Sequence, residues 1–139
     1  MLRTAITTGL LLALTACTSE SRLVTGEFVA AEANPASVAG VRLVVAADKQ
    51  SAQLVHTDGQ VQPLALTPVK QEEWDLGCPS QWSSVALETF LVEPSTLRIG
   101  KLELQNAKLT AGCFSEQPQA ILEGTQSGGH QSVLFDARP

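Results

Sequence analysis

The sequence predicts an all-β fold, a small antiparallel barrel or sandwich, and three observations support this prediction. Its apolar runs are short and rich in β-branched residues, which favours strands over helices. Residues typical of turns recur between these runs at short intervals. One segment reverses the phase of its apolar alternation, as a hairpin does. The domain that these signals describe covers residues 23–139, which is close to the usual size of a single domain.

The strands follow from the apolar runs, and the turns follow from the residues between them. In chain order, the predicted strands are residues 23–31, 41–45, 52–57, 60–66, 84–92, 96–99, 102–104, 108–111, 120–123 and 132–135. Turns or loops are predicted at residues 48–51, 93–95, 105–107 and 127–129. Asp58-Gly59 fits a two-residue type I′ hairpin loop, because both residues tolerate positive φ.

Two proline positions add detail to this outline. Pro63 lies in the predicted strand 60–66 and lacks an amide hydrogen, so we expect a sheet edge or a bulge there. One short helix is possible near residues 35–39, because Asn34 could cap it and Pro35 suits the first helical position. Spacing of short strands in this way is typical of a small barrel or sandwich.

The segment 96–104 is the best-specified hairpin of the chain. Leu97 and Ile99 stand at odd positions, whereas Leu102 and Leu104 stand at even ones, so a single strand would place the two pairs on opposite faces. A type II′ turn centred on Gly100-Lys101 removes this conflict, because glycine is required at its first central position. Ile99 then lies opposite Leu102, and Leu97 lies opposite Leu104.

In the same register, Arg98 and Glu103 are paired on the other face of the hairpin. An opposite-charge pair of this kind stabilises a sheet by roughly 0.2–1 kcal/mol.

The first seventeen residues have the pattern of an export signal. Arg3 precedes a short apolar segment, residues 5–16, which ends in Leu14-Thr15-Ala16-Cys17. The segment is shorter than the about 20 residues that span a bilayer, but it suits the core of a signal peptide. It resembles a bacterial lipoprotein signal peptide, which implies cleavage before Cys17 and attachment of diacylglycerol and a further acyl chain such as palmitate. The alternative is an ordinary secretory signal, in which Cys17 is incidental.

Lipidation would set the location of the protein. Residues 1–16 would be removed, and residues 17–22 would form the lipidated cysteine and a tether of at most roughly 17 Å beyond it. Several acyl chains make such an anchor firm. The expected location is therefore the cell envelope, bound to the membrane. By the same resemblance, Thr18 in place of Asp after the cysteine favours the outer membrane if the host is Gram-negative.

The remaining cysteines, Cys78 and Cys113, form an even pair in an exported chain, where a disulfide is the default expectation. Closing this loop of about 35 residues would stabilise the fold by about 3.8 kcal/mol. The alternative is two separate thiols. Neither cysteine belongs to a Cys-x-x-Cys motif or has a second ligand at metal spacing, so we expect no redox or metal site there.

Trp74 and Trp82 flank Cys78 in the most distinctive stretch of the mature chain. Two interpretations remain open. Trp74, Asp75 and Trp82 could belong to a binding loop at a barrel mouth, or the two indoles could pack over the disulfide and close the core. We favour packing, because aromatic side chains are few in this chain and each buries a large area.

Charge restricts the partners. Removal of Arg3 leaves eight basic and fourteen acidic side chains, a formal charge of −6. Nucleic-acid binders carry basic patches, and anionic lipid attracts basic segments, so both modes of binding are disfavoured. The expected contact with the membrane is therefore the lipid anchor, and the protein or small apolar ligand that the domain binds is not identified by the sequence.

Motifs that would indicate catalysis, cofactor binding or metal binding are absent from the sequence. The histidines are His56 and His130, and an enzyme would need one of them beside a carboxylate in a cleft. We therefore predict no enzyme and no cofactor, but a lipid-anchored envelope protein with a non-catalytic binding or structural role. Two alternatives are a carrier of a small apolar ligand inside a barrel and an inhibitor of an envelope hydrolase.

Two short segments resemble those of a known group of β domains. Ser95-Thr96-Leu97-Arg98-Ile99-Gly100 and the later Gly112-Cys113 resemble segments of the META or heat-shock-lipoprotein-like domains. This resemblance covers a small part of the chain, and no function is carried over from it.

Overall fold

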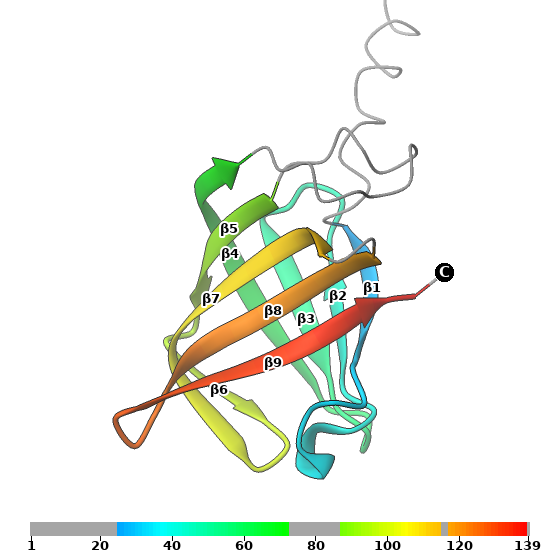
Figure 1. Cartoon of the computed structure of the whole chain (residues 1–139), viewed down its shortest axis with the longest axis vertical. Helices are drawn as coiled ribbons and strands as arrows, with labels where there is room; N and C mark the ends of the chain where they lie inside the picture. Colours follow the sequence, from blue (N-terminus) through cyan, green and yellow to red (C-terminus); the bar gives the residue numbers. More distant parts are fainter. Residues whose placement is uncertain (1–24, 73–86, 115–116, 139) are drawn as a thin grey trace, which may run out of the picture.

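The computed structural model of this chain describes residues 25–72, 87–114 and 117–138 (Figure 1). The strands are, in chain order, β1 (Gly26–Ala30), β2 (Arg42–Val45), β3 (Ser51–Val55), β4 (Val61–Glu72), β5 (Leu87–Glu93), β6 (Thr96–Ile99), β7 (Leu102–Phe114), β8 (Gln117–Gln126) and β9 (Gly129–Ala137). A 3₁₀ turn, η2 (Ala36–Val38), lies between β1 and β2. The predicted all-β fold is confirmed, and it is a barrel rather than a sandwich.

The barrel has a simple up-and-down order. Consecutive strands pair in antiparallel fashion, except β5 and β6, and β1 pairs with β9. β5 and β6 occupy one position in the wall, because both pair with β7 and run in the same direction. The wall therefore counts eight strands. Within the described residues, no helix is long and apolar enough to cross a bilayer.

Apolar side chains fill the interior of the barrel. Alternate residues of each strand point inward, so that β2, β3 and β6 each show an alternation of buried and more exposed positions. Less than 2% of the surface is accessible for ten large side chains: Phe28, Leu43, Leu54, Phe90, Leu97, Ile99, Leu104, Leu109, Leu122 and Phe135. Since a void that holds water would expose its lining, no water-sized cavity adjoins these ten residues. No polar or charged residue is buried in the described part of the chain.

The hairpin predicted at Gly100-Lys101 is confirmed in every pairing. Leu97 lies opposite Leu104, Arg98 opposite Glu103 and Ile99 opposite Leu102. Gly100 has a φ of 62°, as its position in the turn requires. The prediction succeeded because the apolar phase and the turn residue specify the same register.

The β3–β4 connection differs slightly from the prediction. The amide of His56 donates to the carbonyl of Gln60, and the amide of Gly59 donates to the carbonyl of His56. The loop therefore holds three residues, 57–59, and not the two-residue Asp58-Gly59 turn. A three-residue loop with glycine last is the next most common hairpin connection.

Two predicted turns are not chain reversals. At residues 93–95 the chain passes from β5 to β6 without changing direction, and the Glu93–Pro94 peptide bond there is cis. Residues 105–107 lie inside β7, where the pairing register shifts and Asn106 takes a φ of 53°. Residues 93–95 form a kink, because β5 and β6 both pair with β7, and residues 105–107 form a bulge, because β7 continues through them as one long strand.

The short helix expected near residues 35–39 is the single 3₁₀ turn η2, and Asn34 does not cap it. Instead, the side chain of Asn34 pairs with the backbone of Leu134. Its Nδ2 donates to the carbonyl oxygen of Leu134 at 2.6 Å, and its Oδ1 accepts from the amide of Leu134 at 3.0 Å. The ladder of β1 and β9 ends at Ala30 and Phe135, and the amide of Ala31 donates one further bond to the carbonyl of Leu134. The side-chain amide of Asn34 then reinforces the pairing at Leu134, where the chain leaves the sheet.

The two ends of the barrel differ in what they carry (Figure 1). At the entry end, uppermost in Figure 1, β1 begins and β9 finishes. At the far end, lowermost in Figure 1, lie η2 and the β3–β4, β6–β7 and β8–β9 hairpins. Any segment that precedes residue 25 therefore joins the barrel at the entry end.

Candidate functional site

At the far end, a pocket of about 550 Å³ lies between β4 and β6. We call it the slot. Its walls come from η2, the β3–β4 hairpin, the start of β4, and β6 with its turn. The residues that line it are Ser37, Val41, His56, Thr57, Asp58, Gln60, Val61, Gln62, Pro63, Arg98 and Gly100.

The slot exists because the barrel wall is interrupted there. Pairing of β4 with β5 runs from Glu72 down to Ala65, which lies opposite Glu93. Beyond that point the chain shifts at residues 93–95, and β6 pairs with β7 alone. The lower part of β4, residues 61–64, pairs with β3 alone. Two neighbouring strands of the wall are therefore left without a ladder between them.

The backbone groups that face the slot from β6 follow from its pairing with β7. Ile99 and Leu102 flank a two-residue turn and are bonded to each other, so Leu97 and Leu104 form the next bonded pair. In an antiparallel ladder, bonded and non-bonded pairs alternate. The amide and carbonyl groups of Thr96 and Arg98 therefore point away from β7 and toward the slot.

The β4 edge presents fewer groups. Even-numbered residues of β4 bond to β3, as Leu66 does to Gln50, so the backbones of Val61 and Pro63 face the slot. Pro63 has no amide hydrogen to offer there. The edge expected at Pro63 is thus confirmed, and the bulge in this strand lies elsewhere, between Pro68 and Lys70. Pro63 breaks no bond with β3, which explains why a central strand accepts it.

Charges in the slot are few and exposed. Arg98 lies 3.8 Å from Glu103 of β7, and 77% of the Arg98 side chain is exposed. The carboxylate of Asp58 accepts a hydrogen bond from the amide of Gln60 in its own turn. The His56 side chain makes no hydrogen bond within the described residues. Arg98 is therefore the group best placed to meet an anionic partner.

The turn of η2 closes the end of the slot. A Cβ atom placed on Gly100 would lie 1.9 Å from the carbonyl oxygen of Ser37. Only glycine lets η2 approach the β6–β7 turn so closely. The contact joins two walls of the slot that are more than sixty residues apart in the sequence.

A second pocket of about 430 Å³ lies at the entry end, between the β2–β3 turn and the β4–β5 ladder. Its charged groups satisfy each other, because the Nζ of Lys49 lies 2.6 Å from Oε1 of Glu88. Both side chains are mostly buried in this ion pair. The pocket therefore offers less to a ligand than the slot does.

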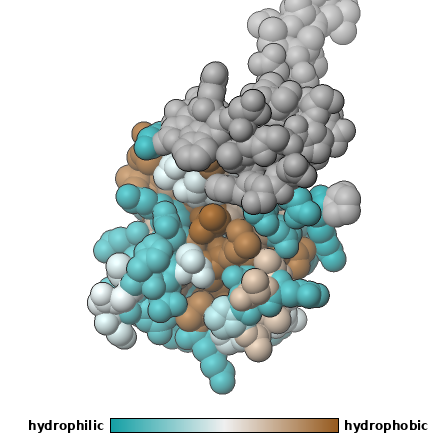
Figure 2. Space-filling model, in the orientation of Figure 1, coloured by the Kyte–Doolittle hydropathy of each residue, from teal (hydrophilic) through white to brown (hydrophobic). Residues whose placement is uncertain are grey.

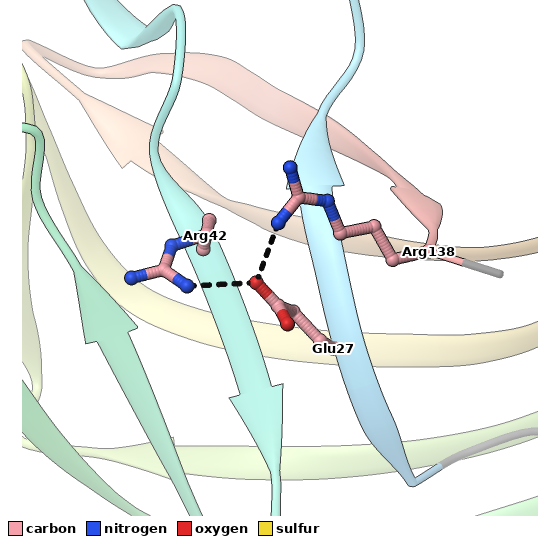
Figure 3. Close-up of polar contacts among 3 residues, drawn as sticks. All are labelled: Glu27, Arg42 and Arg138. Carbon is pink, nitrogen blue, oxygen red and sulfur yellow. Dashed lines mark hydrogen bonds and ion pairs between the residues drawn. The ribbon is translucent and has the colours of Figure 1, made fainter.

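The outer surface carries one larger charge cluster, on β1 and β2 and beside the end of β9 (Figure 3). Oε1 of Glu27 accepts hydrogen bonds from Arg42 at 2.8 Å and from Arg138 at 3.2 Å. The bond from Arg42, together with the positive charges of both guanidinium groups, holds the pKa of Glu27 below its ordinary value. The cluster links three chain segments and is structural in character.

Apolar residues also appear on the outside of the barrel. Figure 2 shows apolar surface among hydrophilic side chains on the face that β8 and β9 form. Ile121 and Leu134 lie opposite each other on these strands and are half-buried. Val61, at the rim of the slot, is 51% exposed. Of these surfaces, only the rim of the slot adjoins unpaired backbone.

Most of the site residues predicted from the sequence lie outside the described part of the chain: Cys17, Trp74, Asp75, Cys78 and Trp82. The backbone of Cys113 lies in β7 opposite Pro118, and its side chain is outside the description, so the disulfide stays a prediction.

His56 lines the slot, whereas His130 lies on the outside of β9, 3.5 Å from Glu123. Among the described residues, no cluster of histidine, cysteine and acidic groups could hold a metal ion. The slot was not predicted from the sequence, although Pro63 and residues 93–95 were signals of it.

No family model, no curated protein and no solved structure matches this chain.

Proposed function

We propose that this protein is a lipid-anchored, non-catalytic binding protein of the cell envelope, which binds its partner at the far end of the barrel. The observation that carries the proposal is a contrast within the barrel. Among the described residues, the large inward side chains are packed together and buried, but the wall is interrupted at the end opposite to the one where the chain enters. An anchor on Cys17 would hold the entry end toward the membrane, because Cys17 precedes β1. The slot would then face away from the lipid.

The packed interior weighs against the carrier of an apolar ligand. Such carriers need a cavity within the barrel. The ten large inward side chains named above leave no room for a ligand beside them. The alternative of a hydrolase inhibitor depends on a loop near residues 72–82, and no described contact favours it.

Binding is also favoured over catalysis by the contacts in the slot. His56, Asp58 and Ser37 are residue types that hydrolases use, and all three line the slot. The carboxylate of Asp58, however, is held by its own turn, and no hydrogen bond joins it to His56 within the described residues. A catalytic triad needs a nucleophile, a base and an orienting group joined in sequence by hydrogen bonds.

The anchor is tested by Cys17→Ser. We expect the wild-type protein to carry a diacyl or triacyl adduct by intact mass spectrometry and to fractionate with membranes. The variant should lose the adduct and move to the soluble fraction, because no acyl chain can attach through a thioether. Ser19→Ala is the matched control and should behave like the wild type. An unmodified wild-type terminus, or a variant still bound to membranes at the same level, would contradict the proposal.

The binding face is tested by photo-crosslinking in intact cells, with a crosslinking amino acid at Gln60 or at Gln131. Gln60 lines the slot, whereas Gln131 is an exposed residue of β9 outside it. We expect a discrete adduct from position 60 and none from position 131. Equal adducts from both positions, or none from position 60, would contradict a binding role for the slot.

A further inference from the structure

We propose that the slot binds an extended peptide segment of a partner protein, which adds to the free edge of β6 as an antiparallel strand. This inference rests on the proposed binding role of the slot and specifies the chemistry of its partner. Strand addition is a general mode of peptide recognition, in which main-chain hydrogen bonds supply affinity and alternate side chains supply specificity.

The free edge of β6 supplies the hydrogen bonds. Thr96 and Arg98 each direct an amide and a carbonyl group away from β7, as their pairing in the hairpin requires. These residues are two positions apart, so their groups are spaced by roughly 7 Å along the strand. An antiparallel partner strand presents its own amide and carbonyl pairs at the same spacing. Two such pairs could therefore form along the four residues of β6.

The opposite wall does not compete for the same peptide. Pro63 removes one donor from the β4 edge, so β4 cannot complete a ladder there. β4 and β6 also run in opposite directions, since β4 is antiparallel to β5 and β6 continues the direction of β5. A peptide antiparallel to β6 would lie parallel to β4. The slot is therefore asymmetric: its β6 edge can form hydrogen bonds with the peptide, whereas its β4 edge only lies beside it.

The size of the slot agrees with a short peptide. Its volume of about 550 Å³ lies within the range of roughly 300–1,000 Å³ that ligand pockets have. The edge of β6 is four residues long, which corresponds to roughly 13 Å of extended chain. A segment of four or five residues matches this edge.

The side chains of β6 determine the sequence that fits. Leu97 and Ile99 are fully buried and point inward, whereas Thr96 and Arg98 are exposed and point outward. Peptide residues opposite Thr96 and Arg98 would point outward as well, and the residues between them would point toward the apolar side. Arg98 favours an acidic residue opposite it, as Glu103 already is on the β7 side. The expected partner segment alternates apolar and acidic residues.

The same charge disfavours a second copy of this chain as the occupant. Pairing of two β6 edges would bring two Arg98 side chains close together on one face of the sheet, and like charges in that position are destabilising. Arg98 thus selects an acidic peptide and rejects its own edge.

The probe for this proposal is the peptide Ac-Val-Glu-Val-Glu-Val-NH2, titrated into the ¹⁵N-labelled protein as it is isolated from cells. Amide hydrogen exchange of Thr96 and Arg98 should slow about tenfold at saturation, because both amides become bonded. The amides of Leu97 and Ile99 already bond to β7 and should change little. This alternation along β6 distinguishes strand addition from binding through side chains alone.

Two altered peptides and two variants of the protein distinguish the contribution of backbone hydrogen bonds to binding from the contribution of charge. Methylation of the two Glu amide nitrogens should abolish binding, although the protein is unchanged. Replacement of both Glu by Lys should weaken binding about two- to fivefold, the size of a cross-strand charge pair. Arg98→Ala should remove this preference for Glu but retain binding. Arg98→Pro should abolish binding, because it removes the amide that faces the slot and breaks no bond with β7.

The proposal is overturned by equal binding of the methylated peptide, by equal changes at all four β6 amides, or by no change at about 5 mM probe. Changes at Thr96 and Arg98 that depend on protein concentration without any probe would identify a second copy as the occupant and would also overturn it. A crosslink from position 60 without any response to the probe would retain the proposed binding role and reject strand addition. If neither the crosslink from position 60 nor a response to the probe is observed, both the binding role of the slot and strand addition are rejected.

Discussion

The barrel is closed on one side and interrupted on the other, although backbone pairing stops short on both sides. On the closed side, which we call the seam, the ladder of β1 and β9 ends at Ala30 and Phe135. Beyond it, the amide of Ala31 donates one further bond to the carbonyl of Leu134, and the side chain of Asn34 adds a donor and an acceptor to the same residue. On the other side, β4 and β6 do not pair, and no hydrogen bond between side chains of the described residues joins residues 61–64 to β6. Closure of a barrel therefore depends on a few side chains as well as on strand number.

The charged side chains also differ between the seam and the slot. At the seam, Glu27 binds two arginine residues that come from β2 and from the end of β9. At the slot, the one ion pair of Arg98 within the described residues is a long contact with Glu103, and Arg98 is mostly exposed. The seam thus satisfies its polar groups within the chain, whereas the slot leaves them to solvent or to a partner. This difference makes the slot the better candidate for a binding face.

The largest effect is expected where η2 closes the slot. Gly100→Ala should destabilise the fold by about 2–5 kcal/mol, because it adds the cost of positive φ, about 1–2 kcal/mol, to a collision with the carbonyl of Ser37. Gly128→Ala is the matched control, since Gly128 also has positive φ but has no atom within 4 Å of an added Cβ. Urea denaturation of both variants measures the difference. Equal losses would show that η2 does not press on the β6–β7 turn.

At the seam, Asn34→Ala should destabilise the fold by about 1–3 kcal/mol. The change leaves the amide of Leu134 without its partner and removes one of the two hydrogen bonds to the Leu134 carbonyl, which still accepts from the amide of Ala31. Amide exchange of Leu134 should accelerate, which urea denaturation alone would not reveal. Asn34→Asp retains the acceptor and loses the donor, so its loss should lie between those of the wild type and the alanine variant. An unchanged exchange rate at Leu134 would contradict a role of Asn34 in closing the barrel.

Sequence patterns predicted the parts of this fold that local chemistry determines. The β6–β7 hairpin was predicted residue by residue, because the alternation of Leu97, Ile99, Leu102 and Leu104 permits one register only. The all-β class and the edge at Pro63 were predicted for similar reasons. In each case, the residues that give the signal lie within a few positions of the feature they determine.

The parts that were missed depend on distant segments. The sequence suggested that Asn34 caps a helix, but its partner is Leu134, one hundred positions away. The 93–95 and 105–107 segments have the composition of turns. Only the pairing of β5 and β6 with β7, and of β7 with β8, makes them a kink and a bulge. The slot follows from that same kink, so it could not be predicted without the pairing of β5 and β6 with one strand.

The smallest effect is expected from the charge cluster at the seam, and it should depend on pH. The pKa of Glu27 is lower in the folded protein than its ordinary value of 4.5, chiefly because of the hydrogen bond from Arg42. A carboxylate with a lowered pKa stabilises the fold above its unfolded pKa, and this contribution is lost as the pH falls through the folded pKa. Glu27→Gln should therefore be less stable than the wild type at neutral pH, and the difference should shrink as the pH falls below 4.5.

Glu32→Gln serves as the control, because Glu32 is exposed and has no ion pair within the described residues. Urea denaturation from neutral to acidic pH measures the difference, which should also decrease at high salt because the cluster is partly exposed. A difference that stays constant with pH would mean that Glu27 acts through packing and not through its charge.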